Sequence, residues 1–91
     1  MHAVVIRVSI QDEGPAAEYL RENIVPRVSQ APGFVAGYWV RLEGGAEGNS
    51  VVVFESEDAA KAAAEQIGGA VDSNPGVTLK DVTVGEVVAN A

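Results

Sequence analysis

The first ten residues show an alternation of apolar and polar positions. Along residues 2–10 the even positions are mostly apolar, whereas the odd positions include Arg7 and Ser9. A period of two is typical of a β-strand with two unlike faces. We therefore predict a strand over 2–10. The side chains expected to face a core are Val4, Ile6 and Val8.

The next segment changes to a helical period. Asp12 and Glu13 favour a helix N-terminus, and Pro15 fits the first turn, where its missing N–H is not needed. Apolar residues then recur every three or four positions, which predicts one buried helical stripe. This stripe consists of Ala17, Leu20, Ile24 and Val28. Pro26 is expected to kink or loosen the last turn.

Two strands joined by a glycine-rich loop are predicted next. Pro32 and Gly33 end the helical region, and the β-compatible residues of 34–42 form the second strand. The third strand is predicted over 51–55. The loop between them is expected to contain Gly44, Gly45, Gly48 and Asn49.

The last third of the chain predicts a helix and a strand. Ser56 is a suitable helix N-cap, and Gly68 and Gly69 are expected to stop the helix. After the turn residues 74–76, segment 77–88 forms one strand, or two that are interrupted near Gly85.

The resulting order is βαββαβ in a single domain over residues 1–91, which gives a four-stranded antiparallel sheet with both helices on one face. For the second strand we place Trp39 and Arg41 on the open face. Phe34, Tyr38 and Val40 are expected to lie under the helices, with Tyr38 beneath the first one. An even or an odd hairpin loop would exchange the two sets of side chains, so this assignment stays open. The open face is expected to mix valines with Arg7, Trp39, Arg41, Glu55 and Asp81, as an interface or a ligand pocket would.

Composition narrows the class of protein. The chain is 47% hydrophobic and 21% charged, which predicts a folded protein, and its net charge of −7 disfavours binding to nucleic acid or anionic lipid. No apolar stretch reaches the roughly 20 residues of a membrane span, and no leader pattern is visible, so we expect a cytoplasmic protein. The chain has no cysteine and one histidine, His2, which leaves no predicted metal site.

The segment from Pro32 to Trp39, the Val51–Glu55 strand and the helix start at Ser56 together resemble the dimeric α+β barrel superfamily. In that superfamily two ferredoxin-like sheets face each other across a two-fold axis. The chain looks most similar to small antibiotic-biosynthesis-monooxygenase-like domains. The resemblance implies a homodimer, and an oxidation of aromatic or quinol substrates by oxygen with no cofactor. Haem-degrading relatives need a histidine ligand near or after the second helix, and His2 does not match that position.

Each candidate residue also has a structural interpretation. Arg7 and Arg41 could hold an anionic or enolate substrate, or they could pair with Glu55 or Asp81. Trp39 could stack on a flat ligand or anchor an interface. Glu55 or Asp81 could act as a general base or as an ion-pair partner. His2 lies too near a free terminus to be favoured for catalysis.

The sequence is therefore compatible with two functions. The first is the binding, with cofactor-free oxidation, of a small aromatic or anionic molecule. The second is a non-catalytic ligand-binding or structural dimerisation module. An effector-binding domain shares the strand order, but such domains are usually fused to an enzyme. Whether the chain is an enzyme stays open at this point.

Overall fold

The computed structural model describes residues 1–91 and shows the predicted βαββαβ order. The first helical segment is continuous but consists of an α-helix, a π-helical turn (η1) and a second α-helix. The elements are β1 (His2–Ile10), α1 (Glu13–Tyr19), η1 (Leu20–Ile24), α2 (Val25–Ser29), β2 (Phe34–Arg41), β3 (Glu47–Phe54), α3 (Glu57–Asp72) and β4 (Val77–Glu86).

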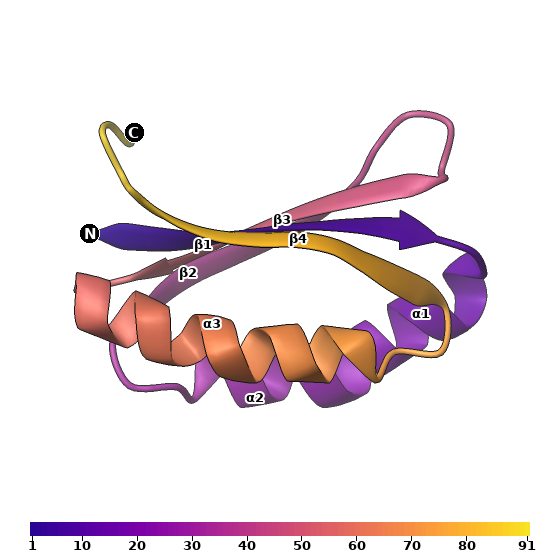
Figure 1. The fold of residues 1–91 in the computed structure, drawn as a ribbon, viewed down its shortest axis with the longest axis horizontal. Helices are drawn as coiled ribbons and strands as arrows, with labels where there is room; N and C mark the ends of the chain where they lie inside the picture. Colours follow the sequence, from indigo (N-terminus) through magenta and orange to yellow (C-terminus); the bar gives the residue numbers. More distant parts are fainter.

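The four strands form one sheet in the order β2-β3-β1-β4, and all its neighbouring strands are antiparallel. Both helical segments lie on the same face of this sheet, and the β2–β3 loop and the C-terminal tail curve away on the other side (Figure 1). The fold is therefore the predicted ferredoxin-like α+β fold. None of its helices has the length and hydrophobicity that a transmembrane span requires.

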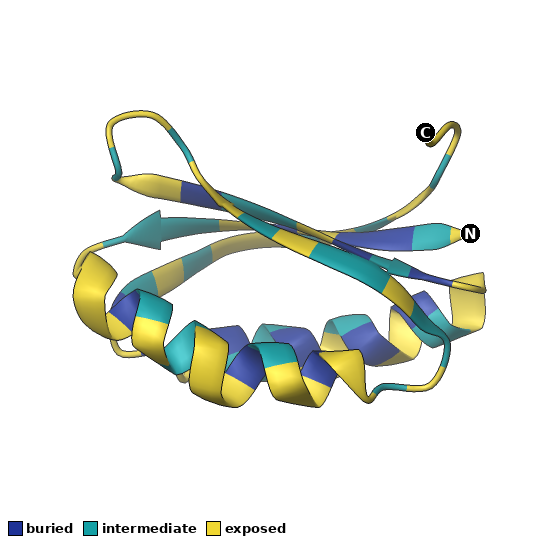
Figure 2. Cartoon of the chain, turned by 180° about the vertical axis from the view of Figure 1, so that it is seen from behind, coloured by how far each residue is buried: buried dark blue, intermediate teal, exposed yellow.

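The core lies between the sheet and the helices, where the buried residues gather (Figure 2). On β1, Val4 and Ile6 are completely or almost completely buried, whereas Val5 and Arg7 are exposed, as the alternation predicted. Phe54 at the end of β3 is fully buried and meets Phe34 edge to face, with ring centroids 6.2 Å apart. Burying a side chain of this size contributes about 2 kcal/mol or more to folding.

Pro26 accounts for the π-helical turn. It has no N–H to donate to the carbonyl of Glu22, and in a regular α-helix its ring would collide with that carbonyl. The preceding turn is widened, so that the Val25 N–H donates to the carbonyl of Leu20, five residues back. The predicted disturbance is confirmed, but it falls one turn earlier than expected.

Two sequence-based boundaries were wrong. Helix α3 does not stop at Gly68 and Gly69 but continues to Asp72. Ile67 and Val71 are both buried on its inner face, and their packing stabilises the turn that contains the two glycines. Strand β3 begins at Glu47, so residues 48 and 49 belong to the strand and not to the loop. Strand β4 runs past Gly85 as one strand.

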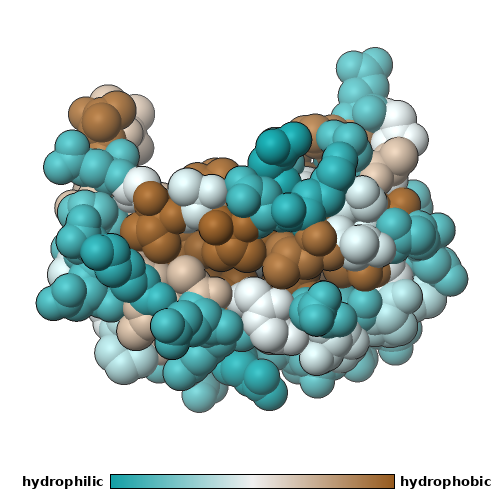
Figure 3. Space-filling model, viewed as in Figure 1, coloured by the Kyte–Doolittle hydropathy of each residue, from teal (hydrophilic) through white to brown (hydrophobic).

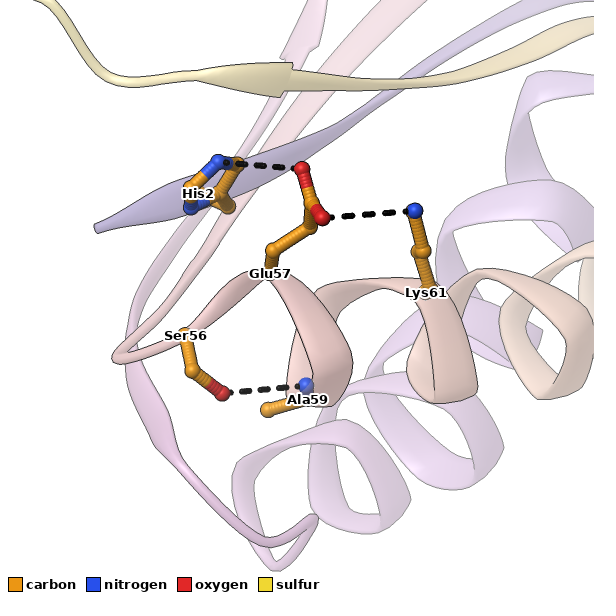
Figure 4. Close-up of polar contacts among 5 residues, drawn as sticks. All are labelled: His2, Ser56, Glu57, Ala59 and Lys61. Atoms are coloured by element: carbon orange, nitrogen blue, oxygen red, sulfur yellow. Dashed lines mark hydrogen bonds and ion pairs between the residues drawn. The ribbon is translucent and has the colours of Figure 1, made fainter.

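Helix α3 begins as predicted, at Ser56. The Ala59 N–H donates to Ser56 Oγ at 3.1 Å, and Glu57 in the first turn pairs with Lys61 (Figure 4). Both interactions satisfy or complement the free N–H groups at a helix N-terminus. They fix the position at which the chain leaves β3 and turns beneath the sheet.

The turn before β4 is docked against the start of α1. The carbonyl of Gly76 accepts from the N–H groups of Gln11 and Asp12, and the buried Asn74 donates from Nδ2 to the carbonyl of Ala16. A Cβ at Gly76 would collide with the carbonyl oxygen of Asp12 and would lie 2.7 Å from the amide nitrogen of Ala16. This close approach requires glycine.

We predict that Gly76→Ala lowers the free energy of unfolding by about 2 kcal/mol or more, because backbone atoms must separate to admit the methyl group. Gly69→Ala is the matched control, since nothing lies within 4 Å of its Cβ position. In a helix interior this change should stabilise the protein by about 0.5–1 kcal/mol. Urea unfolding measures both effects, and equal effects of the two variants would contradict the docking.

Candidate functional site

A bulge in β2 determines which of its side chains face the helices. Phe34 pairs with Phe54, but the next pair is Ala36 with Val53, so Val35 is an extra residue in the ladder. One extra residue moves every later side chain of the strand to the opposite face. Trp39 consequently lies opposite Ser50, on the helix-facing side of the sheet.

The predicted orientation of β2 was therefore wrong beyond the bulge. Trp39 and Arg41, which we had placed on the open face, face the helices, and Trp39 packs against the core. Tyr38 and Val40, which we had placed under the helices, are 66% and 54% exposed. Only Phe34, before the bulge, keeps its predicted inward orientation.

The redirected side chains line a cavity of about 410 Å³ between the sheet and the first helical segment. The inward-facing residues of β3 explain the space, because they become smaller along the strand from Phe54 through Val52 to Ser50 and Gly48. The space between the sheet and the helix is therefore wedge-shaped. The apolar side chains of its lining are Ile6, Val8, Ile10, Ala16, Ala17, Leu20, Ile24, Trp39, Val71 and Val77.

The polar part of the lining contains few groups. Arg41 Nη1 forms an ion pair with Glu13 Oε1 between β2 and α1, and both side chains are more than half exposed. Arg21 on the π-helical turn also lines the cavity, but it forms no ion pair with a carboxylate of the chain. The cavity is therefore an apolar chamber with charged groups among its lining.

Two uncharged polar side chains complete the lining. Asn74 is committed to structure, because it donates to Ala16 and its Oδ1 accepts from the Gly76 N–H at 3.0 Å. Ser50 faces the cavity from β3 and shares in no side-chain hydrogen bond of the chain. Ser50 and the Trp39 indole opposite it can thus offer hydrogen bonds to a ligand.

The other candidate residues lie away from this cavity. Arg7 and Asp81 lie opposite each other on β1 and β4, on the open face, and form no ion pair; Asp81 Oδ2 accepts from Thr83 Oγ1 at 3.0 Å. Glu55 is exposed just beyond β3, and its N–H donates to the carbonyl of Gly33. The predicted pairing of the arginines with Glu55 or Asp81 is wrong, since Arg41 pairs with Glu13 instead.

The site contains residues that the sequence interpretation missed, namely Glu13, Arg21 and Ser50. Glu13 was interpreted only as a helix-start residue. Arg21 lies four residues after Ala17 and three before Ile24, so it borders the predicted stripe and lines the cavity beside it. Ser50 was assigned to the end of a loop. The alternation of Ser50, Val52 and Phe54 was the available signal for a longer strand.

The open face of the sheet carries a second apolar surface. Tyr38, Val51, Val5 and Thr83 form one row across the four strands, and Val40 follows in the next row. The four apolar residues Val5, Tyr38, Val40 and Val51 are each at least 37% exposed. Helices cover only the other face (Figure 2). A further band of apolar side chains is visible between β4 and α3 (Figure 3), where Leu79, Val82 and Val84 pack only partly against the core.

Solved structures with the same fold include a haem degrader, a cofactor-independent oxygenase and a dimeric ferredoxin-like protein. MhuD, described as a haem degrader from Mycobacterium tuberculosis, superposes in a mutant form that holds two manganese protoporphyrins per active site, with a TM-score of 0.72 and 23% identity over 100% of this chain and 98% of that one. SnoaB, a cofactor-independent oxygenase from Streptomyces nogalater, gives 0.68 and 16% over 98% and 94%. A dimeric ferredoxin-like protein from an uncultured marine organism gives 0.63 and 13% over 100% and 98%.

No family model and no curated protein sequence matches the chain. The structural likenesses extend over almost the whole chain in each case and confirm the predicted resemblance to antibiotic-biosynthesis-monooxygenase-like domains at the level of the fold. The chain therefore has the fold of small oxygenases and of dimeric ferredoxin-like proteins. The likenesses do not define a ligand for this chain.

Haem does not fit the residues of the cavity. Iron in haem proteins is held by histidine, cysteine, methionine or tyrosine, and none of these lines the cavity. His2 lies at the far end of β1, where its Nε2 is 3.5 Å from Glu57 Oε2 (Figure 4). Its Nδ1 is buried without a hydrogen-bond partner. No three histidine, cysteine or acidic side chains cluster as metal ligands.

We predict that Gly37→Ala displaces the Trp39 ring, because a Cβ at position 37 would lie 2.8 Å from the indole Cη2. Trp39 is the single tryptophan, so its fluorescence emission should shift by several nanometres relative to the wild type. Gly85→Ala in β4 is the control, since its Cβ would meet nothing within 4 Å. An unchanged emission in Gly37→Ala would contradict the packing of the Trp39 ring over Gly37.

Proposed function

We propose that the cavity beneath the sheet binds a small, flat aromatic or anionic molecule and that the protein is a cofactor-independent, monooxygenase-like enzyme. The observation that carries this proposal is the joint presence of Trp39 and two arginines in one otherwise apolar cavity. The volume of about 410 Å³ lies within the range of small-molecule pockets, about 300–1,000 Å³. A planar indole offers a stacking surface for an aromatic ring.

The polar groups favour a ligand that carries an acceptor oxygen. The indole of Trp39 and the guanidinium groups of Arg21 and Arg41 only donate hydrogen bonds, and Ser50 can also donate. Donors aimed at an oxygen stabilise the phenolate or enolate form of a hydroxylated aromatic compound. That electron-rich form is the one that reacts with oxygen.

The proposed reaction needs no external reductant. A ring CH₂ group and O₂ give a C=O group and one water molecule, so one oxygen atom enters the product and the other leaves as water. The likeness to SnoaB, a cofactor-independent oxygenase, supports this class of reaction. The residues of the cavity would bind the substrate, orient it and stabilise its oxyanion.

Non-catalytic binding is the second candidate, and one observation favours it. Glu13 is the one carboxylate among the lining residues, and it is exposed and already paired with Arg41. A general base must reach the proton that it removes. A binding protein has no need of such a base.

Ligand binding is tested by thermal unfolding with hydroxylated aromatics, quinols and small organic acids. A compound present at about a hundred times its dissociation constant should add about 2.7 kcal/mol to stability, which raises Tm by about 10 °C or more. Trp39→Leu should remove this shift. Tyr38→Leu, a change on the open face, should keep it, and a shift that survives in Trp39→Leu would place the ligand elsewhere.

Oxygen uptake with the compounds that bind separates the two candidates. An enzyme should consume one O₂ for each product molecule, without added metal or flavin. Binding without uptake would assign the cavity to a binding protein.

We also propose that the open face pairs with a second copy of the chain. Four of its exposed side chains are large and apolar, and an exposed apolar sheet face is typical of an interface. In a two-fold dimer each contact occurs twice, so Arg7 and Asp81, which have no ion-pair partner within the chain, offer complementary charges. The dimeric ferredoxin-like neighbour supports this arrangement. We also propose that the protein is cytoplasmic.

Sedimentation velocity tests the dimer. Val51→Asp places a charge in the middle of the apolar row and should convert the dimer into a monomer at micromolar concentration. Val88→Asp, in the exposed tail, is the control and should leave the mass unchanged. A monomeric wild-type protein would overturn this part of the proposal.

A further inference from the structure

The basic residues of this acidic chain differ in whether they form ion pairs. Six basic residues face thirteen acidic ones, yet Arg21 lines the cavity and pairs with none of them. Arg41, by contrast, is already neutralised by Glu13. The cavity thus has one compensated guanidinium and one that is free to meet a ligand.

Arg21 belongs to the π-helical turn. Leu20, Arg21 and Ile24, which belong to this turn, all line the cavity. Leu20 and Ile24 are four residues apart, and Arg21 and Ile24 are three apart, so the three side chains are neighbours on one helix surface. An apolar wall and a donor group are thereby presented to the same ligand.

We infer that the cavity selects an amphipathic organic anion, with a flat apolar body under the sheet and a carboxylate or similar group bound by Arg21. This inference rests on the proposed function, because it names the class of ligand for the same cavity. Arg21 offers a fork of N–H donors that matches the geometry of a carboxylate. Glu13 opposes the same ligand, since it occupies Arg41 and adds a negative charge at the cavity.

The two residues are therefore opposed in their effect on affinity. Removing the charge of Arg21 weakens the binding of an anion, whereas removing that of Glu13 strengthens it by releasing Arg41. The Glu13–Arg41 pair is more than half exposed, and pairs of this kind contribute little to stability. Its replacement by a ligand carboxylate therefore costs little.

The test uses three naphthalene compounds of similar shape and different charge: 2-naphthoate, neutral 2-naphthol and the cation of 2-naphthylmethylamine. Calorimetric titration into the wild-type protein at physiological salt should show 2-naphthoate binding about ten-fold more tightly than 2-naphthol, with the amine weakest. Arg21→Gln should weaken 2-naphthoate about ten-fold and leave 2-naphthol unchanged. Glu13→Gln should tighten 2-naphthoate about three-fold.

Arg27→Gln is the matched control. Arg27 lies on the same helical segment but does not line this cavity, so its loss changes the net charge equally and should leave all three affinities unchanged. An equal loss in Arg27→Gln and Arg21→Gln would reduce the effect to net charge and overturn the inference. Circular dichroism verifies the fold of each variant.

The outcomes separate the two proposals. If the three compounds bind equally, the cavity binds aromatic molecules and the proposed function stands, but the selection of anions is wrong. If none of them binds, the proposed function fails and this inference fails with it. Tight binding of 2-naphthoate that Arg21→Gln does not weaken assigns the anion to another residue and overturns the role of Arg21.

Discussion

The register of β2 against β3 determines which side chains of β2 lie on each face of the sheet. Because side chains alternate along a strand, the one extra residue at Val35 sends Trp39 towards the helices and Tyr38 away from them. Without the bulge, Tyr38 and Val40 would point at the helices, and Trp39 and Arg41 would lie on the open face. The aromatic surface of the cavity and the apolar row of the open face therefore depend on the same irregularity.

A second irregularity lies across the cavity, in the helical wall. Pro26 widens the turn before it, and the residues of that turn, Leu20, Arg21 and Ile24, line the cavity. Strand bulges and π-helical turns are both over-represented at functional sites, because each one redirects a side chain that regular structure would place elsewhere. Here the bulge directs Trp39 to the lining, and the π-helical turn carries Arg21.

The sequence predicted an element correctly where its two faces differ clearly in polarity, and failed where both faces are apolar. Strand β1 was predicted correctly because Arg7 and Ser9 mark its solvent side. Strand β2 has an aromatic or a large apolar residue on both faces, so its pattern did not fix an orientation, and a bulge has no signature that a single sequence reveals. The helix was ended too early at Gly68 because local propensity was given more weight than the buried anchors Ile67 and Val71.

The candidate site was predicted in part for the same reason. Trp39 and Arg41, two of the candidate residues, do line the cavity, but they were assigned to the wrong face of the sheet. Arg7, Glu55 and Asp81 were grouped with them only through that face. Arg21 was missed because the stripe was drawn from apolar residues alone, although its spacing of four from Ala17 and of three from Ile24 places it beside them on the helix.

The shape of the cavity also bears on its purpose. Strand β3 directs Phe54 and Val52 into a tightly packed core at one end, where both are fully buried, and then places only Ser50 and Gly48 towards the helices. A larger apolar side chain in this wedge would bury more apolar surface, which stabilises the fold by about 25 cal/mol per Å². Gly48 is already in close contact, since a Cβ there would lie 3.2 Å from Val8, so Ser50 is the position that could be enlarged. In the function that we propose, the small hydroxyl at that position, opposite Trp39, leaves space for a ligand and offers it a hydrogen bond.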